Sequence, residues 1–293
     1  MEWKGREGSS NVDDARNRSG GGGMGGGGGG LGLLMMIGRV FGIKGILVAI
    51  VAGAVLWKCG IISPSMLNGG GGAASVVSSA DDKERYEFVK VVLKETEVVW
   101  TDEFARHGMT YELPALTVYR GSIGTACGTG SASAGPFYCP GDQRVYIDLG
   151  FYDELAQTFH SPGDFAQAYV IAHEIGHHVQ KLTGISDKVA ARQGQPDYNE
   201  YSVRLELQAD YYAGVWAKRS QQDLKLDKSD IEEAMTAANA IGDDMIQKQM
   251  QGRVTPKAFT HGTAAQRTRW FKKGLDSGRI EDGDTFSLPY KDL

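Results

Sequence analysis

The stretch "VIAHEIGHHVQ", residues 170–180, carries the most specific pattern in this chain of 293 residues. It places His173, Glu174 and His177 in an HExxH arrangement within an apolar run. On a helix, residues four positions apart point only about 40° apart, so both imidazoles can reach one metal ion. Glu174 lies beside them and can act as a general base toward water. Because HExxH also occurs by chance on ordinary helices, the rest of the chain must supply a third ligand.

The segment "RLELQADYYAGVWA", residues 204–217, offers that ligand. Glu206 and Asp210 are four positions apart, at the edge of an apolar helical stripe. A catalytic zinc site takes three protein ligands and keeps one position open. We therefore expect Glu206 to complete a Zn²⁺ site and Asp210 to accept the ring N–H of a ligating histidine. The alternatives are a solvated acidic helix edge and a divalent metal other than zinc.

Composition and periodicity predict an α+β protein with a mostly helical domain and a small β-sheet. Hydrophobic residues make up 41% of the chain and charged residues 23%, and the net charge of −5 shows no basic field for nucleic acid. Alternating patterns predict strands over residues 115–121 and 143–150. Helical spacing begins at Asp81 and continues over residues 151–158, 164–183, 197–219, 228–249 and 263–275.

The first 80 residues indicate a membrane-anchored organisation. We expect a flexible polar and glycine-rich tail over residues 1–30, a membrane-anchor segment over residues 31–58 that spans at about 41–57, and a Ser/Gly-rich linker over residues 59–80. Residues 81–293 would then form the folded domain. Basic residues before the apolar stretch place the N-terminus in the cytoplasm and the domain outside the inner membrane, in the periplasm. A buried core helix and a cleaved signal peptide are the alternatives.

Cys127 and Cys139 flank a loop rich in glycine and serine, "CGTGSASAGPFYC". In an oxidising compartment such a pair favours a disulfide that closes a small loop. Two free thiols are the alternative. A zinc site there is disfavoured, since no CxxC spacing or nearby histidine pair supports it.

Several long stretches resemble the bacterial family called putative neutral zinc metallopeptidases. The similar stretches are "MEWKGREGSSNVDDARN", "FYCPGDQRVYIDLGFYDEL", "AHEIGHHVQ" and "ELQADYYAGVWA", and the resemblance covers nearly the whole chain. HExxH followed by ExxxD is also the pattern of the gluzincin group of metallopeptidases. The resemblance implies a zincin-type fold and a metal-dependent peptidase.

Four further expectations concern residues on or near the HExxH helix. A segment with His261 and then Arg267 is similar to one in membrane-associated gluzincins, where the histidine is placed to stabilise the oxyanion. Tyr211 is a further donor candidate. Peptidases of this kind commonly bind an extended substrate along an edge strand, and the strand at residues 143–150 is the candidate. His178 lies about 140° from His173 around the helix and should point away from the metal.

These observations favour a membrane-anchored zinc metalloendopeptidase. Its partners would be a polypeptide substrate and, through the N-terminal anchor, the lipid bilayer. One alternative is a catalytically silent zinc-binding scaffold, which would not need Glu174 as a base. A second is a zinc amidohydrolase that acts on cell-wall peptides, because attack on an amide is the same chemistry.

Overall fold

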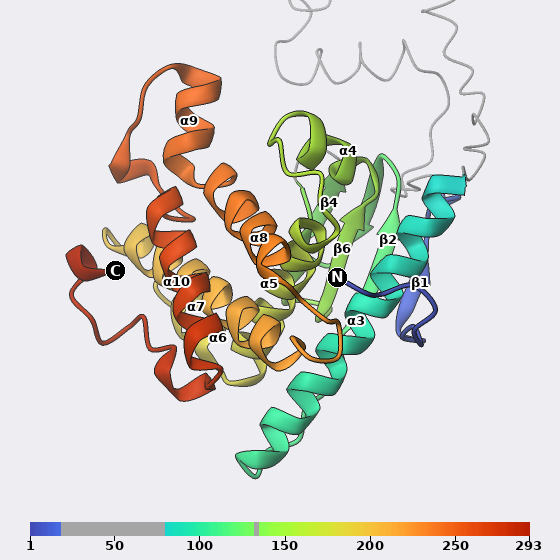
Figure 1. Ribbon diagram of the computed structural model, residues 1–293. Helices are drawn as coiled ribbons and strands as arrows, with labels where there is room; N and C mark the ends of the chain where they lie inside the picture. The colour runs from blue at the N-terminus through green and yellow to red at the C-terminus, as the bar shows by residue number, and fades with distance from the viewer. Residues whose placement is uncertain (19–79, 132–134) are drawn as a thin grey trace, which may run out of the picture. The chain divides into compact units, whose positions relative to one another are not determined.

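The computed structural model describes residues 1–18, 80–131 and 135–293. These residues belong to one compact unit in which helices pack beside a four-stranded sheet (Figure 1). The expected α+β class with a mostly helical domain is confirmed. The first long helix, α3 (Ala80–Arg106), buries Phe88, Val92 and Trp100 in the common core.

The sheet has the order β1-β2-β6-β5. Its strands are β1 (Val12–Asp14), β2 (Ala115–Tyr119), β6 (Arg144–Asp148) and β5 (Phe137–Cys139). β1 and β6 flank β2 in parallel, and β5 pairs with β6 antiparallel. β6 is therefore paired on both sides. The expectation that this strand is a free edge for substrate is wrong, and β5 and β1 are the two edge strands of this sheet.

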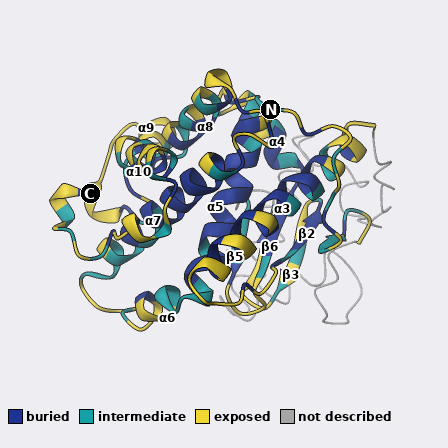
Figure 2. Cartoon of the chain, turned by 60° about the horizontal axis from the view of Figure 1, so that its bottom comes forward, coloured by how far each residue is buried: buried dark blue, intermediate teal, exposed yellow. Residues whose placement is uncertain are grey.

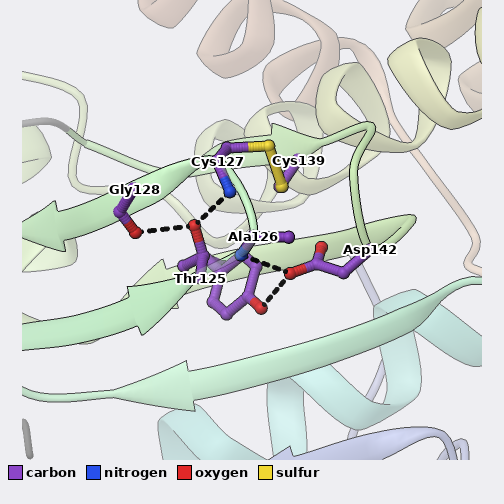
Figure 3. Close-up of a disulfide and its surroundings, with 7 residues drawn as sticks. Thr125, Ala126, Cys127, Gly128, Cys139 and Asp142 are labelled. Carbon is purple, nitrogen blue, oxygen red and sulfur yellow. Dashed lines mark hydrogen bonds between the residues drawn. A yellow bond between two sulfur atoms is a disulfide. The ribbon is translucent and has the colours of Figure 1, made fainter. Parts of the chain in front are cut away.

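A disulfide connects β5 to a small hairpin. The hairpin consists of β3 (Ser122–Thr125) and β4 (Gly128–Ser131), and Cys127 lies in its turn. Cys127 is bonded to Cys139, the last residue of β5, with 5.8 Å between the Cα atoms. The Thr125 hydroxyl accepts from the Cys127 amide and donates to the Gly128 carbonyl (Figure 3). The hairpin is thus tied to the edge of the sheet.

The helical layer surrounds one buried helix. After α4 (Gly150–Gln157) comes α5 (Asp164–Leu182), which carries HExxH and is buried along most of its length (Figure 2). The later helices are α6 (Ile185–Ala190), α7 (Tyr198–Arg219), α8 (Lys228–Ala240), α9 (Asp243–Gln251) and α10 (Ala264–Ser277). Short 3₁₀ turns follow at Pro256–Ala258, Ile280–Asp282 and Tyr290–Asp292.

The single helix predicted over residues 228–249 is two helices, α8 and α9. The chain turns at Gly242, whose backbone lies directly against the start of α10. A Cβ atom at Gly242 would lie 2.3 Å from the Ala264 nitrogen, so only glycine fits there. Apolar periodicity cannot show such a close approach between distant segments. The turn matters because it brings Asp243 next to His261.

Residues 1–18 are not part of a flexible tail, and that prediction is wrong for them. Trp3 is buried, and its indole N–H donates to Asp164 Oδ2 at 2.8 Å. Ala15 is also buried, and β1 lies between these two anchor points. The ion pair of Arg6 with Glu95 of α3 adds a further contact. Two buried apolar residues, one short strand and several polar contacts dock the segment, although its average composition is polar.

This docking bears on the expected membrane topology. The Arg16 guanidinium donates to the Asp82 carbonyl at 2.8 Å, so the chain on either side of residues 19–79 lies together. The predicted anchor over residues 31–58 lies outside the described residues. Within the described residues, no helix is long and apolar enough to cross a bilayer.

Candidate metal centre

Close packing of α5 on α7 brings the two sequence motifs together. Gly176, inside HExxH, lies against Ala209, inside ExxxD. A Cβ atom at Gly176 would lie 3.0 Å from both the Cα atom and the carbonyl oxygen of Ala209. A larger residue would therefore push the helices apart. The glycine allows the side chains on both helices to converge at one point.

The three expected ligands meet at that point. Glu206 places one carboxylate oxygen 3.2 Å from His173 Nε2 and the other 3.4 Å from His177 Nε2. The three ligand atoms lie within 4.8 Å of one another. A tetrahedral zinc site with bonds of about 2.0–2.1 Å separates its ligand atoms by about 3.3 Å. The side chains therefore fit a zinc ion with His₂Glu ligation.

A charged cluster holds His173 from behind. Its Nδ1 lies 2.8 Å from Asp210 Oδ1, and Asp210 is fully buried. The Tyr169 hydroxyl donates to the same carboxylate at 2.5 Å. Arg267, on α10, donates to both Asp210 oxygens, at 2.8 and 3.0 Å. Asp210 thus lies where the sequence predicts, and Arg267 is its buried counter-ion.

A neutral side chain holds His177. Its Nδ1 lies 2.8 Å from Gln180 Oε1, and Gln180 is fully buried. The sequence interpretation missed Gln180, although its spacing of three residues from His177 places it on the same helix face. In both histidines the second ring nitrogen has a partner, so both Nε2 atoms are directed toward Glu206. Such partners orient metal-ligating histidines.

The protonation of the metal-free site is dominated by mutual attraction between its charges. Burial opposes the charged form of His173, but Asp210 and Glu206 raise its pKa to about 10. Burial also opposes ionisation of Glu206, yet the two histidines hold its pKa well below the ordinary value. The pKa values of both histidines are raised in the metal-free site, so protons compete with a metal for them. Metal binding must release them, as expected for such ligands.

Glu174 faces a cleft of about 610 Å³ beside the ligands. Its side chain is buried, and burial raises its pKa, while His173 and His177 act in the opposite direction. Its carboxylate has no hydrogen-bond partner among the described residues. The cleft is also lined by residues of β5 and by apolar side chains from α4, α9 and the following loops: Phe137, Tyr138, Phe151, Phe159 and Ile246. A carboxylate so placed is available to a molecule in the cleft.

His261 also lines this cleft and is oriented by Asp243. Its Nδ1 lies 3.1 Å from Asp243 Oδ1, and its backbone N–H donates to Asp243 Oδ2 at 2.7 Å. The amides of Thr260 and Gly262 donate to the same oxygen. The hydrogen bond with Asp243 and the charge of Glu206 raise the pKa of His261. Asp243 was not predicted, because the turn at Gly242 that positions it was not predicted.

Other polar candidates lie away from the ligands. His178 points to the sheet side, where its Nδ1 lies 3.1 Å from the Tyr138 hydroxyl and its Nε2 lies 2.7 Å from the Glu112 carbonyl. This agrees with the expectation that it faces away from the metal. The Tyr211 hydroxyl donates to the Arg279 carbonyl at 2.7 Å. Tyr211 is therefore engaged elsewhere and is not a donor in the cleft.

Comparison with known proteins adds the family. The sequence profile described as "Putative neutral zinc metallopeptidase" matches residues 1–286. Protein YpfJ of Escherichia coli strain K12 is 47% identical over 292 residues, which is 98% of this chain and 99% of that protein. Rv2575 of Mycobacterium tuberculosis strain H37Rv is 45% identical over 188 residues, 60% of this chain and 64% of that protein. Both relatives are described as uncharacterized, and no solved structure matches.

Proposed function

The chain belongs to this zinc metallopeptidase family, and we propose that it is an endopeptidase that hydrolyses polypeptides with one zinc ion per chain. One observation carries the proposal. The Nε2 atoms of His173 and His177 face the Glu206 carboxylate, 3.2 and 3.4 Å away, beside the unengaged carboxylate of Glu174. Three ligands that leave one position open, next to a base, are typical of catalytic zinc sites.

The side chains have separate roles in this proposal. A bound zinc ion supplies Lewis acidity, which polarises a carbonyl and makes water more acidic. Glu174 accepts a proton from the attacking water and delivers it to the leaving amine. Its burial raises its pKa toward the range in which a base can also return the proton. His261, held by Asp243, donates to the oxygen that becomes negative in the transition state.

The cleft is suited to an extended chain. β5 is an edge strand of the four-stranded sheet, and its residues Phe137 and Tyr138 line the cleft with Glu174. A polypeptide can add to such an edge through backbone hydrogen bonds, which are largely independent of its side chains. The substrate role therefore passes from the strand at residues 143–150 to β5. The aromatic walls favour substrates with apolar side chains.

The decisive experiment compares the full chain with Glu174→Gln. We expect one zinc per chain in both proteins and hydrolysis of a quenched fluorescent peptide library by the unsubstituted protein alone. The loss should be at least about 100-fold, the usual contribution of a general base. Glu200→Gln, at an exposed glutamate on α7, is the matched control and should keep full activity.

Two results would contradict the proposal. Zinc binding without hydrolysis in the unsubstituted protein would favour a zinc-binding scaffold. Hydrolysis that survives Glu174→Gln would remove Glu174 from the reaction. If cell-wall peptides alone are cleaved, the enzyme is an amidohydrolase with the same site.

Membrane association belongs to the proposal as well. The apolar segment at residues 41–57 has the composition of a bilayer-inserted segment. Because Arg16 and Asp82 are in contact, any insertion must start and end on the domain's own side of the membrane. Protease protection of tags placed at residue 1 and residue 293 in membrane vesicles would test this. Both tags should have the same accessibility, and opposite accessibility would contradict the inference.

A further inference from the structure

We propose that Gln180 and Gln208 form a positioning relay that couples the metal ligand His177 to the C-terminal segment at Gly283. The inference rests on the proposed metal site but not on peptidase activity. It starts from two buried amide side chains that the proposed reaction does not use. Gln180 is fully buried and Gln208 is 4% exposed, so water does not supply their hydrogen bonds.

The orientation of the Gln180 amide follows from its neighbours. Its Nε2 lies 2.7 Å from the Leu205 carbonyl, which can only accept a hydrogen bond. The NH₂ group must therefore face Leu205, and Oε1 must face His177. That oxygen can only accept, so His177 Nδ1 carries the proton and donates it at 2.8 Å. Once metal binding releases the other proton, His177 Nε2 offers its lone pair to the metal.

The next amide is oriented in the same way. Gln208 Nε2 donates to the Gly283 carbonyl at 2.9 Å, which fixes the NH₂ group on that side. Gln208 Oε1 then accepts the second proton of Gln180 at 3.1 Å. The hydrogen bonds run in one direction from His177 to Gly283. Each of these hydrogen bonds pairs a donor with an acceptor, and turning either amide over would place its oxygen against a backbone carbonyl.

The C-terminal end of the relay is itself anchored. The Thr285 hydroxyl donates to the Arg204 carbonyl at 2.7 Å, and the Arg204 guanidinium donates back to the Thr285 carbonyl. Thr285 is fully buried. This reciprocal pair fixes the segment on α7 two residues from Gly283. The position of the Gly283 carbonyl is thus set by α7 and not by a free loop.

The relay ends at a second cavity. This cavity of about 480 Å³ is lined by Gln208 and Gly283, together with Ile185, Tyr201 and Phe286. None of these residues lines the catalytic cleft. A shift of the C-terminal segment at this cavity would therefore alter the position of His177 through the relay. The cavity is separate from the cleft proposed for the substrate. Gln180 and Gln208 are positioning residues, because they act through His177 and touch no substrate.

The test measures zinc affinity of the full chain by competition with a chromophoric chelator, and the visible spectrum of the Co²⁺-loaded protein. Gln180→Leu and Gln208→Leu should each weaken zinc binding by about 10-fold or more, the usual effect of losing a partner of a metal ligand. The double variant should bind no more weakly than Gln180→Leu alone, because both substitutions cut one chain. A shifted Co²⁺ spectrum should accompany each loss.

Tyr211→Phe is the matched control. It removes a hydrogen bond from α7 to the same C-terminal segment, at Arg279, and keeps both the ring that packs against Gly283 and the hydrogen bonds of the relay. Its zinc affinity should stay within about twofold of the unsubstituted protein, since the Tyr211 hydroxyl takes no part in the hydrogen bonds that lead to His177. If Gln208→Leu does not fold, Gln208→Asn keeps an amide that is too short to bridge and should show the same loss.

The proposal is overturned if folded Gln208→Leu or Gln208→Asn binds zinc like the unsubstituted protein, or if the two leucine substitutions are additive. It is also overturned if the unsubstituted protein binds no zinc, since His177 would then hold no metal. Zinc binding without peptide hydrolysis would contradict the proposed endopeptidase and leave the relay test intact, because the readout is affinity.

Discussion

The two histidines of the metal site are held by different chemistry. Behind His173 lies a buried ion pair of Asp210 with Arg267, which joins α5, α7 and α10. Behind His177 lie two neutral amides, Gln180 and Gln208. Each histidine has its Nδ1 atom 2.8 Å from an oxygen of its partner, Asp210 or Gln180. The difference lies in what happens when one partner is removed.

A charge left alone in the interior costs far more than an unpaired amide. Breaking a buried ion pair on one side typically costs about 3–5 kcal/mol, since the remaining charge has no compensation. Losing one partner of a buried neutral hydrogen bond costs about 1–3 kcal/mol. We infer that the charged side of the site contributes to the stability of the whole helical layer. The neutral amides Gln180 and Gln208 orient the single ligand His177.

The largest expected effect is that of Asp210→Asn. The substitution keeps the shape of the side chain but leaves Arg267 buried without a counter-ion. We expect a loss of about 3–5 kcal/mol in the free energy of unfolding. Urea denaturation of the metal-free protein measures this directly. A loss no larger than that of Gln180→Leu would remove the distinction between the two sides.

Replacing both ionic partners sharpens the same comparison. Asp210→Leu with Arg267→Met removes the two charges together, and such replacements are often neutral for stability. We expect the pair to recover most of the lost stability but not the zinc affinity, because His173 Nδ1 still lacks an acceptor. Zinc titration of the double variant is the measurement. Full recovery of affinity would show that Asp210 does not orient His173.

The next effect is that of Gln180→Leu on stability. It leaves His177 Nδ1 and Gln208 Oε1 without the Gln180 amide as a partner but creates no unpaired charge. We expect the free energy of unfolding to fall by about 1–3 kcal/mol. The urea midpoint should therefore lie between those of the unsubstituted protein and Asp210→Asn. Thr96→Val, a buried polar change on α3, is a control for general sensitivity of the core.

The smallest expected effect is a shift in the pH dependence of activity. It concerns His261, which is not one of the two histidines compared above. Asp243 raises the pKa of His261, so the charged imidazole persists above its ordinary value of 6.5. Asp243→Asn should lower that pKa and shift the alkaline limb of kcat/KM to lower pH. Activity at pH 6 should fall less than activity at pH 8. A limb that does not move would exclude His261 as the group that titrates there.

The effect of rising pH on stability has the same direction as its effect on activity. A group whose pKa is raised by folding stabilises the protein fully below its unfolded pKa and loses that contribution as pH rises through the folded pKa. The contribution of the Asp243–His261 pair should therefore fade at alkaline pH. Asp244→Asn, at the neighbouring residue that accepts from the Ala264 amide, should leave the pH dependence of activity unchanged.

Periodicity predicted the helices of the site closely. The helix expected over residues 164–183 is α5 at Asp164–Leu182, and the one over 197–219 is α7 at Tyr198–Arg219. Helical spacing alone places His173 near His177, and Glu206 near Asp210, because both pairs are local. The folded N-terminal segment was not predicted. Its few apolar residues matter only once α3 and β2 are present to receive them.

The amino-acid sequence by itself determined which side chains are candidates for metal ligation and which helices present them. It could do so because a residue four positions along a helix always lies on the same face. Only the tertiary structure decided that Asp243 orients His261 and that β5, and not β6, lies at an edge of the sheet. It alone also decided that hydrogen bonds connect Gln180 through Gln208 to Gly283. Each of these joins residues far apart in the chain, and such contacts depend on how closely the packed elements approach, which local spacing does not contain.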